Sequence, residues 1–205
     1  MNAQTKLDTD DTRRQILAAA SQRFTQFGYN KTTMAEIAQD CGMSAANLYR
    51  YFDNKLDIGA NLAGCCLNEK LGLVQAIVDA EQRPAAERLR EVVFTILRFT
   101  HGMWADNPRV NELVNVICEE RMDLVEGHKE QEHALLMKLL QQGIAGGEFA
   151  VTDPEDTATA LMSSLTLFCM PLLMPLYSLE VFEQRADAVV RLVLNGILRN
   201  EKLNR

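Results

Sequence analysis

The chain has 205 residues, of which 47% are hydrophobic and 24% are charged, a globular composition that excludes a mostly disordered protein. Its formal net charge of −7 excludes a protein that binds a polyanion over its whole surface. The five cysteines form no paired framework and the first residues are polar and acidic, so we expect a reduced, cytoplasmic protein without a secretory leader.

The charge is unevenly distributed along the chain. Residues 12–58 carry six Lys/Arg against four Asp/Glu, whereas residues 59–205 carry 14 against 21. An acidic surface repels phosphates. The N-terminal segment is therefore the part of the chain that we expect to approach a polyanion.

The N-terminal region predicts a polar tail followed by an amphipathic helix. We expect residues 1–11 to be disordered. Thr12 and Gln15 have the spacing of a capping box, and they precede a helix that we expect to end at Gly28. One face of this helix is apolar, with Ile16, Ala20, Phe24 and Phe27.

The next stretch predicts two short helices joined by a tight turn. Thr33 and Glu36 form a second capping box, and Gly42 is suited to the positive φ that follows a helix end. Ser44 is a favourable N-cap for the second helix, which buries Leu48 and Phe52. A helix, a short turn with Gly and a second helix are typical of the helix-turn-helix, whose second helix enters the DNA major groove.

The residues of this stretch closely resemble the DNA-binding domain of the tetracycline-repressor (TetR) family. The matching run is Gly28-Tyr29, Thr32-Thr33-Met34, Ile37-Ala38, Cys41-Gly42-Met43-Ser44, Leu48-Tyr49-Arg50-Tyr51-Phe52 and Lys55. The resemblance covers about residues 12–58. It implies a helix-turn-helix DNA-binding domain at 12–58 and an effector-binding and dimerisation domain at 59–205.

The resemblance also implies which residues contact DNA. Phosphate contacts are expected from the start of the first helix and from aromatic and basic side chains, and base contacts from the exposed start of the second helix. The expected DNA-binding residues are Thr33, Ser44, Ala45, Ala46, Asn47, Tyr49, Arg50, Tyr51 and Lys55. Ala45 departs from the family, whose members often have a basic or polar residue there, so shape readout is expected to contribute more.

The rest of the chain predicts further helices and no strand. A long helix is expected from about residue 54 to Ala80, a second from Pro84 to about Trp104, and a third region from Asn107, with a candidate break near Gly127. Two more helices are expected, one from Asp153 that a later proline kinks or ends and one at about 179–198. The fold class is therefore all-α, with an N-terminal three-helix domain and a larger C-terminal helical domain.

The uncharged stretch 157–179 is long enough to suggest a membrane span. Its many Ser and Thr residues, its two prolines and the lack of a flanking basic cluster favour a core or an interface instead. We expect no membrane association.

The resemblance implies two functions for the larger domain. Methionines and aromatic residues suit a pocket for a small apolar or amphipathic effector. The expected pocket residues are Phe94, Leu97, His101, Trp104, Cys118, Met122, Met162, Thr166 and Met170. The expected homodimer interface consists of Leu161, Leu165, Phe168, Phe182, Ala186, Val189, Val190, Val193 and Ile197. Ordinary core packing is the alternative for both sets.

The three histidines raise a metal site as an alternative. His128 and His133 are five residues apart and so lie on different faces of a helix, and several glutamates surround them. A solvated acidic helix surface explains this pattern, and we expect no metal and no cofactor.

Taken together, the chain predicts a homodimeric DNA-binding regulator that binds a palindromic double-stranded operator. The expected mode is repression that a small apolar or amphipathic effector relieves. Two alternatives remain: a metal sensor or helical-bundle enzyme that uses the His and carboxylate groups, and a co-regulator that has kept the fold but lost its operator.

Overall fold

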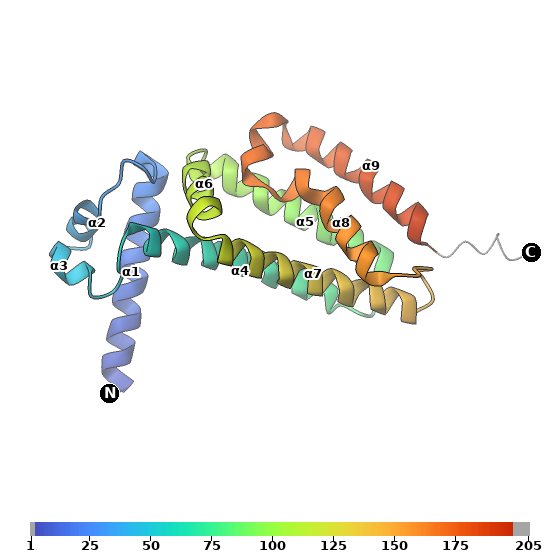
Figure 1. Ribbon diagram of the computed structural model, residues 1–205, viewed down its shortest axis with the longest axis horizontal. Coiled ribbons are helices and arrows are strands. Elements are labelled where there is room, and N and C mark those ends of the chain that lie inside the picture. Colours follow the sequence, from blue (N-terminus) through green and yellow to red (C-terminus); the bar gives the residue numbers. More distant parts are fainter. Residues whose placement is uncertain (1–2, 199–205) are drawn as a thin grey trace, which may run out of the picture. The chain divides into compact units, whose positions relative to one another are not determined.

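The computed structural model describes residues 3–198, except for the side chains of residues 3–9. The elements in this range are helices (Figure 1): α1 (Ala3–Phe27), α2 (Met34–Asp40), α3 (Ala45–Leu48), α4 (Lys55–Val78), α5 (Ala85–Asp106), α6 (Val110–Glu120), α7 (Met122–Ala145), α8 (Pro154–Cys169), the 3₁₀-helix η1 (Pro171–Leu176) and α9 (Leu179–Ile197). The predicted all-α fold is confirmed.

The chain forms two compact units. The first contains residues 1–67 together with 104–125, and the second contains residues 68–103 together with 126–205. This division cuts α4 after Leu67 and places α6 in the first unit. The predicted boundary between a DNA-binding domain at 12–58 and a second domain at 59–205 therefore stays a prediction. The two units are described separately below.

The expected start of the first helix is wrong. Helix α1 begins at Ala3, so residues 3–11 are helical where a disordered tail was expected, and the proposed capping box at Thr12 lies inside the helix. Extending a helix that is already formed requires no new nucleus, and an ion pair of 2.8 Å between Asp11 and Arg14 supports the turn. Residues 1 and 2 lie outside the described residues.

The predicted break at Gly127 also lies elsewhere. The chain leaves the helix at Arg121, where φ is −135° and ψ is 50°, and Gly127 lies within α7. A glycine in a helix interior costs only about 1 kcal/mol, which tertiary packing readily offsets. The guanidinium of Arg121 contacts both carboxylate oxygens of Asp123 at 2.8 Å, which places a negative charge in the first turn of α7.

The core of the first unit joins α1 to the two short helices. Its buried residues are Ile16, Ala20, Phe24, Tyr29, Met34, Ile37, Ala38, Leu48, Phe52 and Ile58. Three of the four residues predicted for the apolar face of α1 belong to it. The fourth, Phe27, is 43% exposed, and it lies within 5.6 Å of the Arg23 guanidinium.

The second unit has its own apolar core and a network of polar hydrogen bonds at one end. The core is formed mainly by α4, α5, α7 and α8. Glu148 accepts hydrogen bonds from the backbone N–H groups of Ala85 and Ala86 at 2.8 and 3.3 Å, so its carboxylate caps the start of α5. The buried guanidinium of Arg88 donates to Val78 O and Gln142 Oε1, both at 2.7 Å. These contacts join the end of α4, the start of α5 and the end of α7.

The loop after α7 packs closely on that helix. The ring of Phe149 is 3% exposed and lies over Gly143, where a Cβ atom would fall well inside van der Waals contact with the ring. The next residue, Ala150, donates its N–H to Ile197 O at 2.8 Å at the end of α9. Because Gly143 has no side chain, Phe149 can pack on α7, and this places Ala150 within hydrogen-bond distance of the end of α9.

We predict opposite effects for two glycine substitutions in α7. Gly143→Ala should lower the free energy of unfolding by roughly 1–3 kcal/mol, because the added methyl group displaces a buried ring. Gly127→Ala, which has open space around the new methyl group, should raise it by about 0.5–1 kcal/mol. Urea unfolding at one protein concentration measures both. Equal stability of the two variants would contradict the close packing of Phe149.

Candidate nucleic-acid interface

Side-chain caps define both short helices. The Thr33 hydroxyl accepts a hydrogen bond from Glu36 N, and the Glu36 carboxylate accepts one from Thr33 N at 2.8 Å, which confirms the predicted capping box. Gly42 has φ +64° in the turn, as its position after α2 predicts. The Ser44 hydroxyl then accepts a hydrogen bond from Asn47 N at 3.2 Å and starts α3.

Helix α3 is short and is positioned by two buried side chains. Regular α-helix covers only Ala45–Leu48, and the chain continues in turns to Tyr51. Leu48 is 0% exposed and Phe52 is 1% exposed, as predicted. Four residues cannot form a stable helix alone, so packing of Leu48 and Phe52 holds this segment in place.

The outward face of this segment carries most of the residues predicted to contact DNA. Ser44, Ala46 and Arg50 are exposed, Tyr49 is 52% exposed, and Asn47 is half-buried. These side chains are accessible to a ligand that approaches α3.

Two of the predicted contacts are partly used for packing. Ala45 and Tyr51 are half-buried against the core of the first unit. The carbonyl of Tyr51 accepts a hydrogen bond from Arg13, whose guanidinium also lies 4.1 Å from the centre of the Phe52 ring. Arg13 therefore links α1 to the end of the α3 segment.

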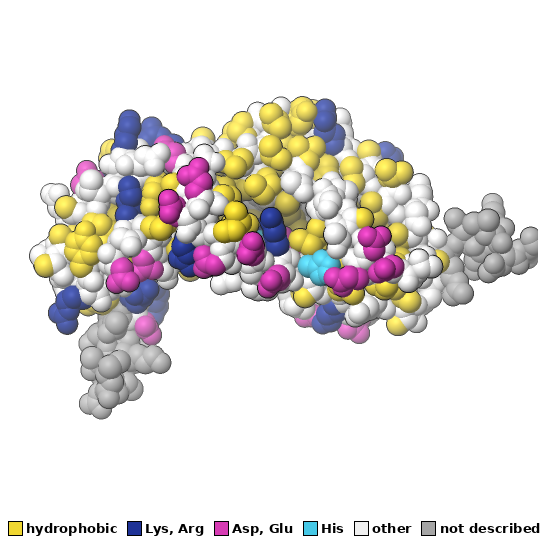
Figure 2. Space-filling model, viewed as in Figure 1, with side chains coloured by type: hydrophobic (Ala, Val, Ile, Leu, Met, Phe, Trp, Pro, Cys, Tyr) yellow, Lys and Arg dark blue, Asp and Glu magenta, His cyan; other side chains and the backbone are white. Residues whose placement is uncertain are grey.

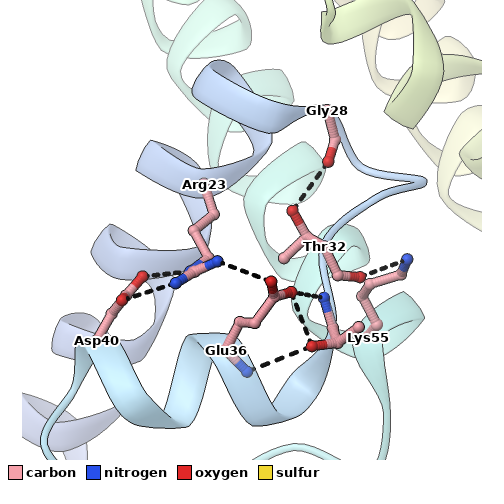
Figure 3. A network of polar contacts seen from close by, with 7 residues as sticks. Arg23, Gly28, Thr32, Glu36, Asp40 and Lys55 are labelled. Carbon is pink, nitrogen blue, oxygen red and sulfur yellow. Dashed lines mark hydrogen bonds and ion pairs between the residues drawn. The ribbon is translucent and has the colours of Figure 1, made fainter.

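Lys55 donates hydrogen bonds within its own unit. Its ammonium donates to the carbonyls of Tyr29, Thr32 and Asn30 at 2.8, 2.9 and 3.4 Å, and it lies 4.3 Å from the Tyr29 ring centre. Figure 3 shows the side chain reaching to Thr32. Desolvation lowers the pKa of Lys55, while Glu112 and Glu36 oppose that shift. These contacts hold the loop before α2, and the phosphate contact expected of this ammonium stays a prediction.

The start of α2 is also occupied by the protein itself. Figure 3 shows the Glu36 carboxylate pointing back over the first turn of its helix. Hydrogen bonds from the Thr33 N–H and hydroxyl lower the pKa of Glu36. Arg23 pairs with Glu36 at 3.3 Å and with both carboxylate oxygens of Asp40. The Thr33 hydroxyl is thus engaged in a cap, although Thr33 is exposed, and its contact with a phosphate stays a prediction.

Lys31 is a candidate contact that the sequence reasoning missed. It is exposed in the loop before α2, and in the described part of the chain neither Lys31 nor Arg50 forms an ion pair. Figure 2 shows Lys and Arg side chains on the surface of α1–α3, together with Asp and Glu side chains. The position of Lys31, one residue before Thr32-Thr33, was the available signal.

Helix α6 packs on the loop that follows α1. The Glu112 carboxylate accepts a hydrogen bond from Asn30 N at 3.0 Å and lies against Gly28, which has φ +89°. Leu113 lies so close to Gly59 that a Cβ atom there would be 2.7 Å from its Cδ1. The loop is thus held by Lys55 of α4 on one side and by Glu112 of α6 on another.

The predicted effector-pocket residues belong to both units. Trp104, Cys118 and Met122 lie in the first unit, and Phe94, Leu97, His101, Met162, Thr166 and Met170 lie in the second. In the second unit, Leu97 is fully buried and Thr166 is exposed. A void of about 10 Å³, enough for one water molecule, lies instead between α5, α8 and α9. The pocket therefore stays a prediction.

Most of the predicted dimer residues are buried in the protomer. Leu161, Leu165, Phe168, Phe182, Ala186 and Val190 are at most 7% exposed, and Val189, Val193 and Ile197 are half-buried. The six buried side chains pack within the second unit, and their assignment to a homodimer interface stays a prediction. The opposite faces of α8 and α9 are exposed.

The histidines also differ from the expected solvated surface. His128 is 8% exposed and its Nε2 lies 3.0 Å from Glu132 Oε1, one turn along α7. His133 pairs with Glu155 at 3.3 Å. Over residues 3–198, no three His, Cys, Asp or Glu side chains gather as metal ligands. A search of the same residues finds no helix that combines the length and the apolar character of a membrane span.

Two family models match the chain. Residues 16–59 match the model described as bacterial regulatory proteins, tetR family, and residues 85–190 match the tetracyclin repressor-like C-terminal domain. Together these segments cover both compact units in part and more than half of the chain.

Individual relatives agree with the family models. The chain is 29% identical over 180 residues to the HTH-type transcriptional repressor BepR of Brucella suis, covering 78% of this chain and 79% of BepR. It is 25% identical over 154 residues to the HTH-type transcriptional regulator YhgD of Bacillus subtilis, covering 74% of this chain and 79% of YhgD.

Solved structures share the fold. A TetR-family regulator from Mesorhizobium loti superposes with a TM-score of 0.75 at 19% identity, covering 93% of this chain and 98% of that one. SmeT, the repressor of the Stenotrophomonas maltophilia multidrug efflux pump SmeDEF, gives 0.70 at 18% identity, covering 95% and 94%. The helix-turn-helix geometry and the two family matches agree: the chain belongs to the TetR family and is a ligand-responsive, DNA-binding transcriptional regulator.

Proposed function

We propose that the protein is a cytoplasmic repressor that binds a palindromic operator as a homodimer and leaves it when a small amphipathic effector binds. The observation that carries this proposal is the α3 segment, in which Leu48 and Phe52 are buried and Tyr49 and Arg50 face outward. The names of BepR and SmeT describe repressors, which supports the direction of control.

The exposed side chains divide into base-reading and phosphate-binding groups. Arg50 and Asn47 can each pair with a base edge, and one good bidentate pair discriminates by about 1–3 kcal/mol. Tyr49 and Lys31 are placed to contact phosphates, and such contacts fix register without reading sequence. Because Ala45 and Ala46 offer only methyl groups, we assign part of the specificity to DNA shape.

A revised dimer face follows from the exposed sides of the last two helices. Thr159, Ser163 and Thr166 form an uncharged exposed stripe on α8, at spacings of four and three residues. Ala188 and Leu192 are exposed on α9, and Leu192 is 74% exposed. Small uncharged side chains let two helices approach closely, so we propose that these stripes pack against those of a second copy.

The proposed control is a shift between two conformations of the dimer. An effector that binds the DNA-incompetent state more tightly moves the population toward it, by no more than its differential affinity. A tenfold change in operator occupancy needs about 1.4 kcal/mol of that difference. The second unit holds a packed core, so the effector must open space between its helices when it binds.

A selection of random duplexes with the full-length protein tests the proposed function. Two copies of α3 on a two-fold axis should enrich a palindrome whose half-site centres are about one helical turn, ~34 Å, apart. Enrichment of a single half-site, or of no sequence, would contradict the proposed operator binding.

We predict that two lysines near α2 behave differently. Lys55→Met should lower the free energy of unfolding by roughly 1–3 kcal/mol, because three carbonyls lose a charged donor. Lys31→Met should leave stability unchanged but flatten the salt dependence of DNA binding by about two counterions per dimer.

Urea unfolding and fluorescence anisotropy with a labelled duplex at several salt concentrations measure the two effects. The assignment fails if Lys55→Met flattens the salt dependence at full stability, since that result would return Lys55 to the phosphate contacts.

We predict that Leu192→Arg separates the dimer. A guanidinium at the centre of the proposed face would be desolvated next to its symmetry mate. Leu73→Arg is the matched control, because Leu73 is 44% exposed on α4, outside the proposed face. Sedimentation at micromolar concentration should show monomers for the first variant and dimers for the second. Intact dimers of Leu192→Arg would place the interface elsewhere.

A further inference from the structure

Three helices of the second unit bring charged groups together at the edge of its apolar core. Lys70 of α4 is 6% exposed, and its Nζ lies 2.9 Å from Glu132 Oε1 of α7. His128 Nε2 lies 3.0 Å from the same oxygen. Cys169 at the end of α8 is close enough for Glu132 and Lys70 to affect its thiol, and burial raises the pKa of that thiol to about 11. We refer to Lys70, His128 and Glu132 as the α7 polar cluster.

The hydrogen bonding of the α7 polar cluster is incomplete. Lys70 Nζ and His128 Nε2 lie 2.9 and 3.0 Å from Glu132 Oε1. In the described part of the chain, four buried side-chain nitrogen or oxygen atoms have no hydrogen-bond partner, and three of them are His128 Nδ1, His128 Nε2 and Glu132 Oε1. Because Nε2 and Oε1 face each other at 3.0 Å, His128 Nδ1 is the atom of these three that has no group opposite it, and native proteins rarely leave such a buried atom unpaired.

The surroundings of the α7 polar cluster are apolar. Val74, Leu136 and Leu165 lie four residues from Lys70, Glu132 and Cys169 on their helices, and each is at most 7% exposed. Residues four apart share a helix face. A ligand held at the cluster would therefore extend along an apolar wall, as an amphipathic molecule requires.

The charges of the cluster select the chemistry of that ligand. Lys70 pairs with the ionised Glu132. Burial raises the pKa of Glu132, but its contacts with His128 and Lys70 outweigh burial and lower that pKa to about 2. A carboxylate ligand would bring a second negative charge next to Glu132. An ammonium ligand would bring a second positive charge next to Lys70. Both are disfavoured where water is excluded. A neutral polar group is favoured.

The histidine defines which neutral group fits. Its Nε2 faces a carboxylate oxygen, so the ring hydrogen lies on Nε2, because two lone pairs at 3.0 Å would repel. In the neutral ring Nδ1 is then an acceptor without a partner. We propose that His128 Nδ1 is the anchor for the effector, and that it accepts a hydrogen bond from a neutral hydroxyl or amide N–H carried on an apolar skeleton.

This assignment rests on the proposed function, because it names the chemistry of the effector in that mechanism. It also excludes fatty acids and other amphipathic carboxylates as preferred effectors. The sequence contained one signal for the site, since His128 and Glu132 are spaced to share a face of α7. The contribution of Lys70 from another helix could be found only in the structure.

Calorimetry with matched probes tests the anchor on the full-length dimer. One series is 1-naphthol, 1-methoxynaphthalene and 1-naphthoate, and the second is 1-decanol, 1-methoxydecane and decanoate. In at least one series the wild type should bind the hydroxyl compound about tenfold more tightly than the methyl ether, the factor typical of one buried hydrogen bond, and more tightly than the acid. No binding in either series, equal binding of hydroxyl and ether, or tightest binding of the acid would overturn the proposal.

Variants of two histidines in α7 locate the effect. His128→Phe should bind the ether as before and lose the tenfold preference for the hydroxyl, whereas His128→Gln, which retains an acceptor, should keep part of it. His133→Phe is the matched control, since His133 pairs with Glu155, and it should keep the full preference. A preference that survives in His128→Phe would overturn the anchor. If that variant does not fold, as its thermal melt would show, the wild-type hydroxyl and ether comparison decides the question.

Operator release is measured separately, by anisotropy of a labelled duplex with the same probes. A hydroxyl preference without release would overturn the effector role in the proposed function and leave the anchor in place. Release by the acids alone would contradict the anchor and leave the repressor mechanism in place.

Discussion

The burial of two side chains, Leu48 and Phe52, determines what the first unit can present to DNA. Each fully buried side chain of this size stabilises the unit by about 1.5–3 kcal/mol. That is enough to hold a four-residue helix that would not persist alone. Because Leu48 and Phe52 face inward, the residues between them on the other side of the segment face outward. Tyr49 and Arg50 are therefore exposed by the same contacts that fix the fold.

The cations near α3 serve two separate purposes. Arg13, Arg23 and Lys55 point inward or along the surface to carbonyls and carboxylates of their own unit. They brace α1, α2 and the loop between them. Lys31 and Arg50 are exposed and form no ion pair within the described residues, which leaves them for phosphates or bases. The capacity of this segment to bind DNA therefore depends less on its net positive charge than on which of its basic side chains face solvent.

The sequence predicted the first unit well because its signals are local. The Thr33–Glu36 capping box, a turn glycine and the spacing of Leu48 and Phe52 each depend on residues within one turn of each other, and each matches the structure. The capping box predicted at Thr12 does not, because α1 already begins at Ala3. The role of Lys55 was not predictable in this way. Its acceptors lie 23 to 26 residues earlier in the chain, and a lysine at a helix start looks the same in sequence whether it faces inward or outward.

The second unit was harder to predict for the same reason. An apolar stripe on α9 indicates that Phe182, Ala186 and Val190 are buried, but not whether the partner is their own chain or a second copy. The interface was predicted from apolar residues, so the small exposed Ser, Thr and Ala side chains on α8 and α9 were not considered for it. Likewise, the surroundings of His128 depend on Lys70 of α4 meeting Glu132 of α7, two residues that are far apart in the chain.

Hydroxyl-radical footprinting on the duplex selected from the random pool tests the central claim most directly. The outward face of α3, carried twice on a two-fold axis, should protect two backbone segments on one side of the duplex, about one helical turn apart. Arg50→Ala should weaken both segments equally, because the two copies are identical. Protection of a single segment, or a footprint that does not respond to the change at Arg50, would contradict the account.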